Sequence, residues 1–231
     1  MSQRQPILNA PGVVVAVIGA LVTVQLARAV LSDAADERLV EMLAFIPERL
    51  GDAGGALPGG RVAALTQFFT HVFVHGDWVH LGINCAWLVA FGPPVARRIG
   101  TARFLAFFLA CGIGGAVFFL IFNSAPMVGA SGAISGLMGA TLRFLFVPLL
   151  DHDAEALAGT RRPHLSSLSA SFTDRRILIA IATWTLINVL VALAAPTLFE
   201  GRNIAWEAHL GGFFTGLLTF GLFDPPPPHS Q

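Results

Sequence analysis

Residues 104–142, FLAFFLACGIGGAVFFLIFNSAPMVGASGAISGLMGATL, contain no charged side chain. About 20 apolar residues cross the hydrocarbon core of a bilayer, so this stretch is long enough for two crossings. The turn-forming sequence Asn-Ser-Ala-Pro at positions 123–126 interrupts it. The stretch therefore predicts two transmembrane helices, over residues 102–122 and 130–147, joined by a short connection.

The composition of the whole chain agrees with a membrane location. Of 231 residues, 55% are hydrophobic and 12% are charged, and the mean hydropathy is +0.70. Soluble domains carry about 25% charged residues. Further apolar segments long enough to span a bilayer lie at residues 11–31, 78–96, 177–195 and 206–223. The sequence therefore predicts an all-α, polytopic membrane protein with a bundle of six transmembrane helices.

The distribution of arginine predicts the orientation of this bundle. We divide the chain into an N-terminal segment (1–10), a membrane domain (11–223) and a proline-rich tail (224–231). With the N-terminus inside, the inner loops hold eight arginines and the outer loops four, and cytoplasmic loops are the arginine-rich ones. We therefore expect both termini in the cytoplasm, a first helix that is not cleaved as a signal peptide, and a bacterial inner membrane location. Arg28 and Arg143 are expected to extend to the nearest membrane surface.

Two loops carry predictions of their own. Residues 33–77 are net acidic and contain a run of apolar residues at helical spacing: Leu39, Met42, Leu43, Ile46 and Leu50. This pattern predicts either a helix lying in the outer interface or an ordinary helix packed over the bundle. Residues 151–176 mix charges with Gly, Pro and Ser, which is typical of a flexible loop.

Charge and cysteine content exclude other classes of protein. The 14 basic residues, all arginine, balance 14 acidic ones, so the chain has no basic footprint for nucleic acid. Cys85 and Cys111 each lie in an apolar run. We expect them to be small buried hydrophobic residues, and predict neither a disulfide framework nor a metal site.

Ser131 is the first candidate for chemistry. A polar side chain at membrane depth costs free energy unless it has a partner, which makes it a functional candidate. Gly132, Gly136 and Ala140 lie four residues apart, a pattern that lets transmembrane helices approach closely, so helix packing is one explanation. Ser131 also follows a predicted loop, and free amides at a helix N-terminus stabilise negative charge. A nucleophile is therefore the other explanation, with Ser135 as the competing serine.

His209 is the second candidate. A lone histidine in an apolar helix is usually a hydrogen-bonded core residue. Gly212 and Gly216, however, form a groove on the same helix face and admit a partner helix at the range that a Ser–His hydrogen bond requires. Glu207 points to another side of the helix, and no other acid lies within a span. We therefore expect a Ser131–His209 dyad without a third member.

Four more polar residues occur as pairs at i, i+4 spacing and so share a helix face. His80 and Asn84 can both donate hydrogen bonds, which suits an oxyanion site; polar contact between helices is the alternative. His71 and His75 have no carboxylate or cysteine beside them at metal-ligand spacing. For this pair we expect a structural role in the loop.

In combination these motifs resemble the rhomboid intramembrane serine proteases. Three of them match the family in order: His80-xxx-Asn84, Gly-x-Ser131-Gly and Ala-His209-xx-Gly-xxx-Gly. The stretch Phe73–His80 is also similar to the family sequence that leads into the second helix. The resemblance covers residues 65–223.

The resemblance implies a six-helix core with Ser131 as nucleophile and His209 as general base. It implies that His80, Asn84 and the Ser131 backbone amide bind the oxyanion. It also implies transmembrane protein substrates within the lipid bilayer, a water-filled cavity open to the outer side, lateral access beside the fifth span, and neither metal nor organic cofactor.

The chain departs from the family pattern at three places. No tryptophan occurs in the first outer loop, where the family has a Trp-Arg pair. Ala96 stands where a glutamate often precedes the basic residues. Ser135 stands where an aromatic residue commonly stacks near the histidine, so the sequence gives no account of how His209 is oriented.

Two other functions are compatible with a polytopic chain of this kind. A catalytically inactive relative would bind membrane clients for quality control, although inactive relatives tend to lose the serine or the histidine. A small transporter would be expected to contain related halves, and the sequence has no such repeat.

Overall fold

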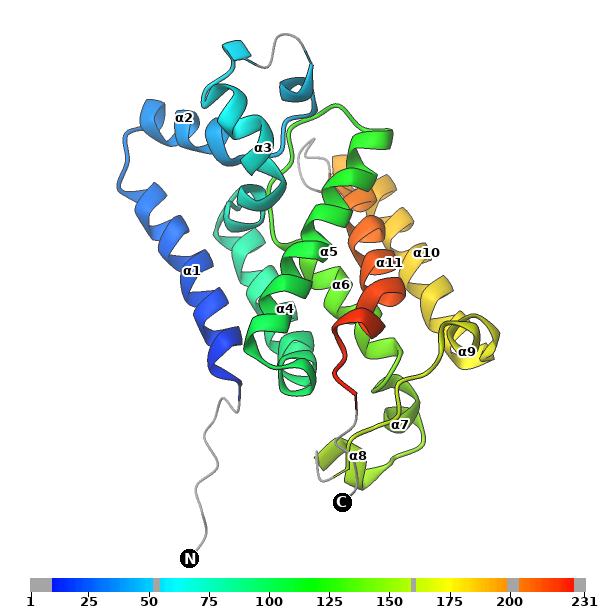
Figure 1. Cartoon of the computed structure of the whole chain (residues 1–231). Coiled ribbons are helices and arrows are strands. Elements are labelled where there is room, and N and C mark those ends of the chain that lie inside the picture. Colours follow the sequence, from blue (N-terminus) through cyan, green and yellow to red (C-terminus); the bar gives the residue numbers. More distant parts are fainter. Residues whose placement is uncertain (1–9, 52–54, 159–160, 199–203, 227–231) are drawn as a thin grey trace, which may run out of the picture.

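The structure, a computed structural model, describes residues 10–51, 55–158, 161–198 and 204–226, and its regular elements are helices. The longer helices are α1 (Gly12–Ala29), α4 (Trp78–Ile99), α5 (Thr101–Phe122), α6 (Ser131–Leu142), α10 (Arg175–Leu198) and α11 (Trp206–Phe223). The shorter ones are α2 (Asp33–Leu43), η1 (Pro47–Leu50), α3 (Gly60–Thr70), η3 (His71–Phe73), α7 (Phe146–Leu150), α8 (Ala154–Ala158) and α9 (Leu168–Thr173). Helices α2 and α3 lie at one end of the bundle, and α7 and α8 lie at the other (Figure 1).

Four of the described helices are long and apolar enough to cross a membrane: α1, α4, α5 and residues Arg175–Ala194 of α10. Helix α6 has 12 residues and at 1.5 Å per residue rises about 18 Å, less than the ~30 Å of a hydrocarbon core. Helix α11 has 18 residues, and Glu207 and His209 in its first turn make it more polar. The all-helical prediction is confirmed, with four of the six predicted spans meeting these criteria.

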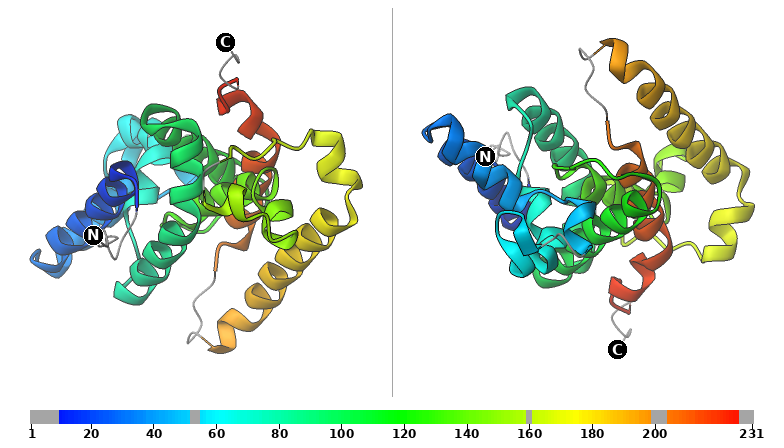
Figure 2. Two further views of the ribbon diagram at one scale, coloured as in Figure 1. Left: turned by 90° about the horizontal axis from the view of Figure 1, so that it is seen from below. Right: turned by 90° about the horizontal axis from the view of Figure 1, so that it is seen from above.

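Helix α6 occupies the centre of the bundle, where it packs against α4, α5 and α11. Seen along the bundle, α1 and α10 lie at opposite edges (Figure 2). A Cβ added at Gly212 would lie 1.9 Å from the carbonyl oxygen of Gly132, and one at Gly216 would lie 2.0 Å from that of Gly136. Because no side chain fits at these crossings, the backbones of α6 and α11 are in direct contact.

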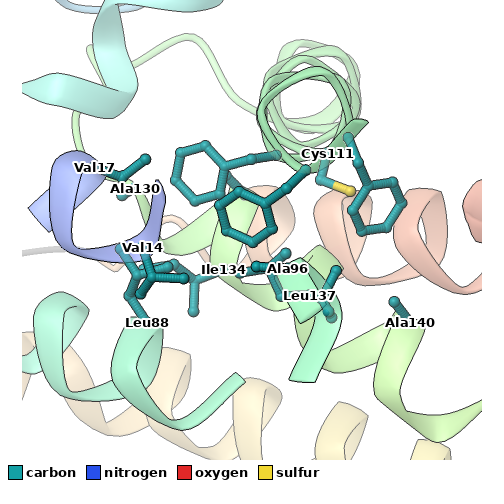
Figure 3. Close-up of a cluster of buried hydrophobic side chains, with 14 of the residues drawn as sticks. Val14, Val17, Leu88, Ala96, Cys111, Ala130, Ile134, Leu137 and Ala140 are labelled. Carbon is teal, nitrogen blue, oxygen red and sulfur yellow. The ribbon is translucent and has the colours of Figure 1, made fainter. Parts of the chain in front are cut away.

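A cluster of buried apolar side chains packs against α6 (Figure 3). Helix α1 contributes Val14, α4 contributes Leu88 and α5 contributes Cys111, and all three pack with Leu137 of α6. Cys111 is fully buried and free, as predicted, whereas Cys85 is free but only partly buried. The core therefore holds α6 against α1, α4 and α5, and it also includes Phe220 of α11.

Helix α6 ends earlier than the predicted boundary at residue 147. The chain turns at Arg143, which is 5% exposed. The guanidinium donates to the carbonyl oxygen of Ser166 at 2.8 and 3.2 Å and to that of Leu217 at 3.3 Å. Arg143 thus lies at the C-terminal end of α6, where backbone carbonyl oxygens of Ser166 and Leu217 satisfy its guanidinium.

Two other predicted boundaries are also wrong. The fifth span does not end before Pro196, because α10 continues to Leu198. The apolar pattern over residues 39–50 is not one helix either: α2 ends at Leu43, and Ala44 is extended. The chain leaves the helix there because Phe45 pairs with Met127 through two backbone hydrogen bonds of 2.8 and 2.9 Å.

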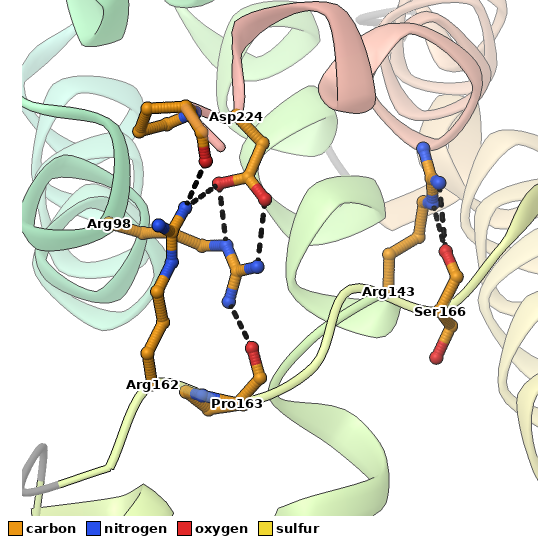
Figure 4. A network of polar contacts seen from close by, with 7 residues as sticks. Arg98, Arg143, Arg162, Pro163, Ser166 and Asp224 are labelled. Atoms are coloured by element: carbon orange, nitrogen blue, oxygen red, sulfur yellow. Dashed lines mark hydrogen bonds and ion pairs between the residues drawn. The ribbon is translucent and has the colours of Figure 1, made fainter. Parts of the chain in front are cut away.

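A polar network closes the end of the bundle opposite α2 (Figure 4). Arg98 of α4 donates two hydrogen bonds to Asp224, which follows α11, at 2.8 and 2.9 Å, and a third to the carbonyl oxygen of Pro163. Arg162 donates to the same carboxylate at 2.6 Å. The segment predicted as a flexible loop is thus attached to two helices, and it also contains α8 and α9.

We predict that Gly212→Ala destabilises the protein because the new methyl group meets backbone atoms that cannot move aside. The expected loss is about 1–3 kcal/mol in the free energy of unfolding, measured in micelles or bicelles. Gly19→Ala is the matched control, since a Cβ there meets nothing within 4 Å. Equal stability of the two variants would contradict the direct backbone contact.

Candidate active site

Ser131 and His209 are in hydrogen-bond contact. Ser131 is the first residue of α6 and His209 lies in the first turn of α11. The distance from His209 Nε2 to Ser131 Oγ is 2.8 Å. The competing serine, Ser135, lies one turn further along α6 and is 5% exposed. The geometry therefore pairs the imidazole with Ser131, the residue at the helix N-terminus.

The other ring nitrogen of His209 also has a partner. His209 Nδ1 lies 2.8 Å from Oδ1 of Asn188, a buried residue of α10. The prediction that His209 has no third member beside it is therefore wrong. Sequence reasoning considered only acids as partners and so missed an amide. The signal was present, because Asn188 is a polar residue in the middle of an apolar span.

His80 and Asn84 line the same cavity as Ser131, and His80 lies beside the connection before α6. Gly129 has φ +123°, and a Cβ there would lie 2.8 Å from His80 Cε1, so this glycine makes room for the ring. The Gly76 amide donates to His80 Nδ1 at 3.4 Å, which leaves the ring proton on Nε2. One hydrogen of the Asn84 amide is donated to the His80 carbonyl oxygen at 2.9 Å. Each side chain thus has an N–H group that can donate further.

The start of α6 adds backbone donors to this group. No side chain caps the helix at Ala130, and the first amides of a helix have no acceptor within the helix itself. These amides carry the positive end of the helix dipole. A negative charge developing beside Ser131 would therefore be stabilised.

His71 and His75 fix the connection that leads to Ser131. The Gly129 amide donates to the His71 carbonyl oxygen at 2.9 Å, and the Ala130 amide donates to His75 Nε2 at 3.4 Å. Burial lowers the pKa of each imidazole to about 4, so both are neutral at pH 7 and His75 can accept. Among the described residues, no group of three His, Cys, Asp or Glu side chains gathers as metal ligands do.

A buried arginine organises the segment between α2 and α3 despite the missing tryptophan. Arg49 is 2% exposed and donates to Gln67 Oε1 and to the carbonyl oxygens of Glu41, Ala44 and Pro58. Sequence reasoning counted Arg49 as an ordinary outer-loop charge. The loop that it fixes carries Phe45, which pairs with Met127, four residues before the nucleophile candidate. Arg49 thereby supports the position of Ser131.

Arg28 connects the C-terminal end of α1 to the same region. Its guanidinium makes two hydrogen bonds to the Asp36 carboxylate, at 2.7 and 3.0 Å, and donates to the carbonyl oxygen of His75. The hydrogen bond from Arg28 lowers the pKa of Asp36. Arg28 therefore lies in the last turn of α1 and ties α1 to α2 and to the loop before α4.

A cavity of about 750 Å³ opens beside Ser131 and His209. Its walls come from α4, α6, α10 and α11 and from the connections before α6 and α11, and they include Asn84, Ser135 and Trp184. Most of the other side chains are apolar, such as Ile83 and Trp87. The site therefore combines a small polar centre with apolar walls between α4 and α10.

Comparison with known proteins agrees with this arrangement. The rhomboid domain family matches residues 62–224. The chain is 40% identical over 76 residues to the rhomboid protease GluP of Bacillus subtilis (strain 168), covering 33% of this chain and 15% of that protein. It is 29% identical over 154 residues to the putative rhomboid protease YdcA of the same organism (66% and 64% of the two chains). It is 31% identical over 147 residues to RHOMBOID-like protein 4 of Arabidopsis thaliana (63% and 31%).

The chain belongs to the rhomboid family. With its apolar helices, this membership makes it an integral membrane protein. The aligned region spans less than two thirds of the length of each of these relatives.

We predict that Arg49→Ala loosens the segment between α2 and α3 because three backbone carbonyl oxygens and Gln67 Oε1 each lose a hydrogen bond. The expected cost is about 1–3 kcal/mol in the free energy of unfolding, together with faster cleavage of residues 44–60 by an added protease. Arg61→Ala is the control, since Arg61 is exposed. If the two variants were digested at the same rate, Arg49 would not be the anchor.

Proposed function

We propose that the protein is an intramembrane serine endopeptidase that cleaves transmembrane segments of other membrane proteins. The observation that carries the proposal is the 2.8 Å hydrogen bond between Ser131 Oγ and His209 Nε2 inside an apolar bundle. A partly buried serine–histidine contact beside a cavity is the arrangement that nucleophilic catalysis needs. Family membership supports the same reaction class.

In the proposed mechanism, Ser131 attacks a peptide carbonyl carbon while His209 Nε2 takes the hydroxyl proton. The tetrahedral intermediate collapses, the C–N bond breaks, and His209 returns that proton to the leaving amine. A water molecule, deprotonated by His209, then attacks the acyl-enzyme and releases the new carboxyl group. Ser131 regains its proton, so the cycle needs only water as co-reactant.

The oxyanion of each tetrahedral intermediate would be bound by His80, Asn84 and the Ser131 amide. His80 Nε2–H, the second amide hydrogen of Asn84 and the free N–H at the start of α6 all belong to the site around Ser131. Such donors stabilise charge most strongly where water is scarce. The helix dipole of α6 acts in the same direction.

The proposal includes a membrane domain over residues 11–223 with six spans, two of them the helices α6 and α11. Segments 1–10 and 224–231 would face the cytoplasm of a bacterium, which puts α2 and α3 on the outer side. Ser131 would then lie below the outer surface, because α6 is too short to reach both faces. Substrate would come from the bilayer beside α10; the connection after that helix falls largely outside the described residues.

The main alternative is a client-binding relative without activity. The contact between the retained serine and histidine favours the protease, since a binding protein needs no such hydrogen bond. The polar residues around the cavity also converge on Ser131 rather than line a path between the two ends of the bundle, which disfavours a transporter.

We predict that Ser131→Ala and His209→Ala each abolish cleavage of a co-expressed model transmembrane substrate. Ser135→Ala is the matched control, since it removes a hydroxyl one turn away on the same helix, and it should keep measurable activity. Product bands would be followed by immunoblot, and folding by thermal unfolding of the purified variants. Cleavage by the Ser131→Ala protein would refute the proposed nucleophile.

We predict that Asn84→Ala lowers kcat about 10²–10³-fold with little change in KM, because an oxyanion donor acts mainly in the transition state. Cys85→Ala tests for general damage to α4 at the neighbouring position, and should leave kcat close to that of the unaltered protein. An Asn84→Ala effect confined to KM would assign the residue to substrate binding instead.

A further inference from the structure

Asn188 is a buried polar residue that the proposed reaction does not yet use. It lies in α10, five residues before the exposed Leu193, and is itself 5% exposed. Its helix also contributes Trp184 to the wall of the cavity. Two hydrogen bonds hold the Asn188 side chain, one to α11 and one within α10.

Those two hydrogen bonds fix which way the Asn188 amide points. Its Nδ2 donates to the carbonyl oxygen of Trp184 at 2.9 Å. A backbone carbonyl can only accept, so the NH₂ group must face Trp184. The side-chain oxygen is therefore the atom directed at His209, at 2.8 Å from Nδ1.

The direction of the amide determines the tautomer of His209. An amide oxygen cannot donate, so His209 Nδ1 must carry the proton that lies between them. In the neutral ring Nε2 is then unprotonated and accepts from the Ser131 hydroxyl, 2.8 Å away. The opposite tautomer would place a proton on Nε2 and block the transfer that the reaction requires.

We propose that Asn188 is a positioning residue that holds His209 in the tautomer and orientation of a general base. This inference rests on the proposed function of Ser131 and His209. Asn188 takes over the orienting role that an aromatic side chain commonly has, because Ser135 occupies that position here. The hydrogen bonds thus run in one series from Ser131 through His209 and Asn188 to the backbone carbonyl oxygen of Trp184.

The same series of hydrogen bonds joins three helices at the site. Ser131 belongs to α6, His209 to α11 and Asn188 to α10. Only 17% of the apolar stretch of α10 is buried, against 44% for α5. The helix that holds the base in place is therefore also one of the least enclosed in the bundle.

The test compares Asn188→Leu with Asn188→Asp in the purified full-length protein with a model transmembrane substrate. Leucine has similar size but no acceptor, and we expect kcat to fall at least about tenfold with KM within about twofold. Aspartate keeps an acceptor toward Nδ1, and we expect kcat within about threefold of the unaltered protein. Ile187→Ala, at a neighbouring and largely lipid-facing position, controls for damage to α10.

Nitrogen NMR of the ¹⁵N-histidine-labelled protein supplies a readout that a merely structural role would not move. We expect a protonated Nδ1 for His209 in the unaltered protein and a shift toward the other tautomer in Asn188→Leu, with the resonance assigned through His209→Gln. If Asn188→Leu does not fold, the tautomer of His209 in the unaltered protein tests the proposal. A proton on His209 Nε2 would overturn it.

The possible outcomes distinguish a failure of the proposed function from a failure of the role of Asn188. Cleavage by Ser131→Ala would refute the proposed function itself. An inactive Ser131→Ala protein, together with an Asn188→Leu protein of unchanged kcat and unchanged tautomer, would refute only the role of Asn188. Equal losses in the leucine and aspartate variants would also overturn it, because the acceptor would then not matter.

Discussion

The direct contact between the backbones of α6 and α11 is the constraint on which the site depends. Glycine at 132, 136, 212 and 216 removes every side chain from the crossing, and a methyl group at Gly212 or Gly216 would lie within about 2 Å of a carbonyl oxygen. In a bilayer such packing replaces the hydrophobic effect as the force between helices. It also sets the distance between the first turns of the two helices, where Ser131 and His209 meet.

The polar side chains at the centre of the site are tolerated inside the apolar bundle because they are partners of one another. Ser131 hydrogen-bonds His209, His209 hydrogen-bonds Asn188, and Asn188 ends the series on a backbone carbonyl. The terminal nitrogens of Arg49 likewise donate to backbone carbonyl oxygens in the segment between α2 and α3. An unpaired group in this environment would cost several kcal/mol. The cost explains why the polar residues form connected chains rather than isolated contacts.

Much of the fold was predictable because apolar length and small-residue spacing are written directly in the sequence. The all-helical architecture, four of the spans and the pairing of Ser131 with His209 follow from such local patterns. Asn188 and Arg49 were not predicted, because their roles depend on which backbone carbonyls and ring atoms the tertiary structure brings to them. The predicted end of α6 was wrong for the same reason. The carbonyl oxygens that accept hydrogen bonds from Arg143 belong to Ser166 and Leu217, which are distant in the sequence.

The central claim is that Ser131 is a nucleophile activated by His209. The most direct measurement is labelling by a fluorophosphonate probe, with the modified residue located by mass spectrometry. The account predicts a covalent adduct on Ser131 that disappears in His209→Ala. An adduct on Ser135, or none on the folded protein, would contradict it.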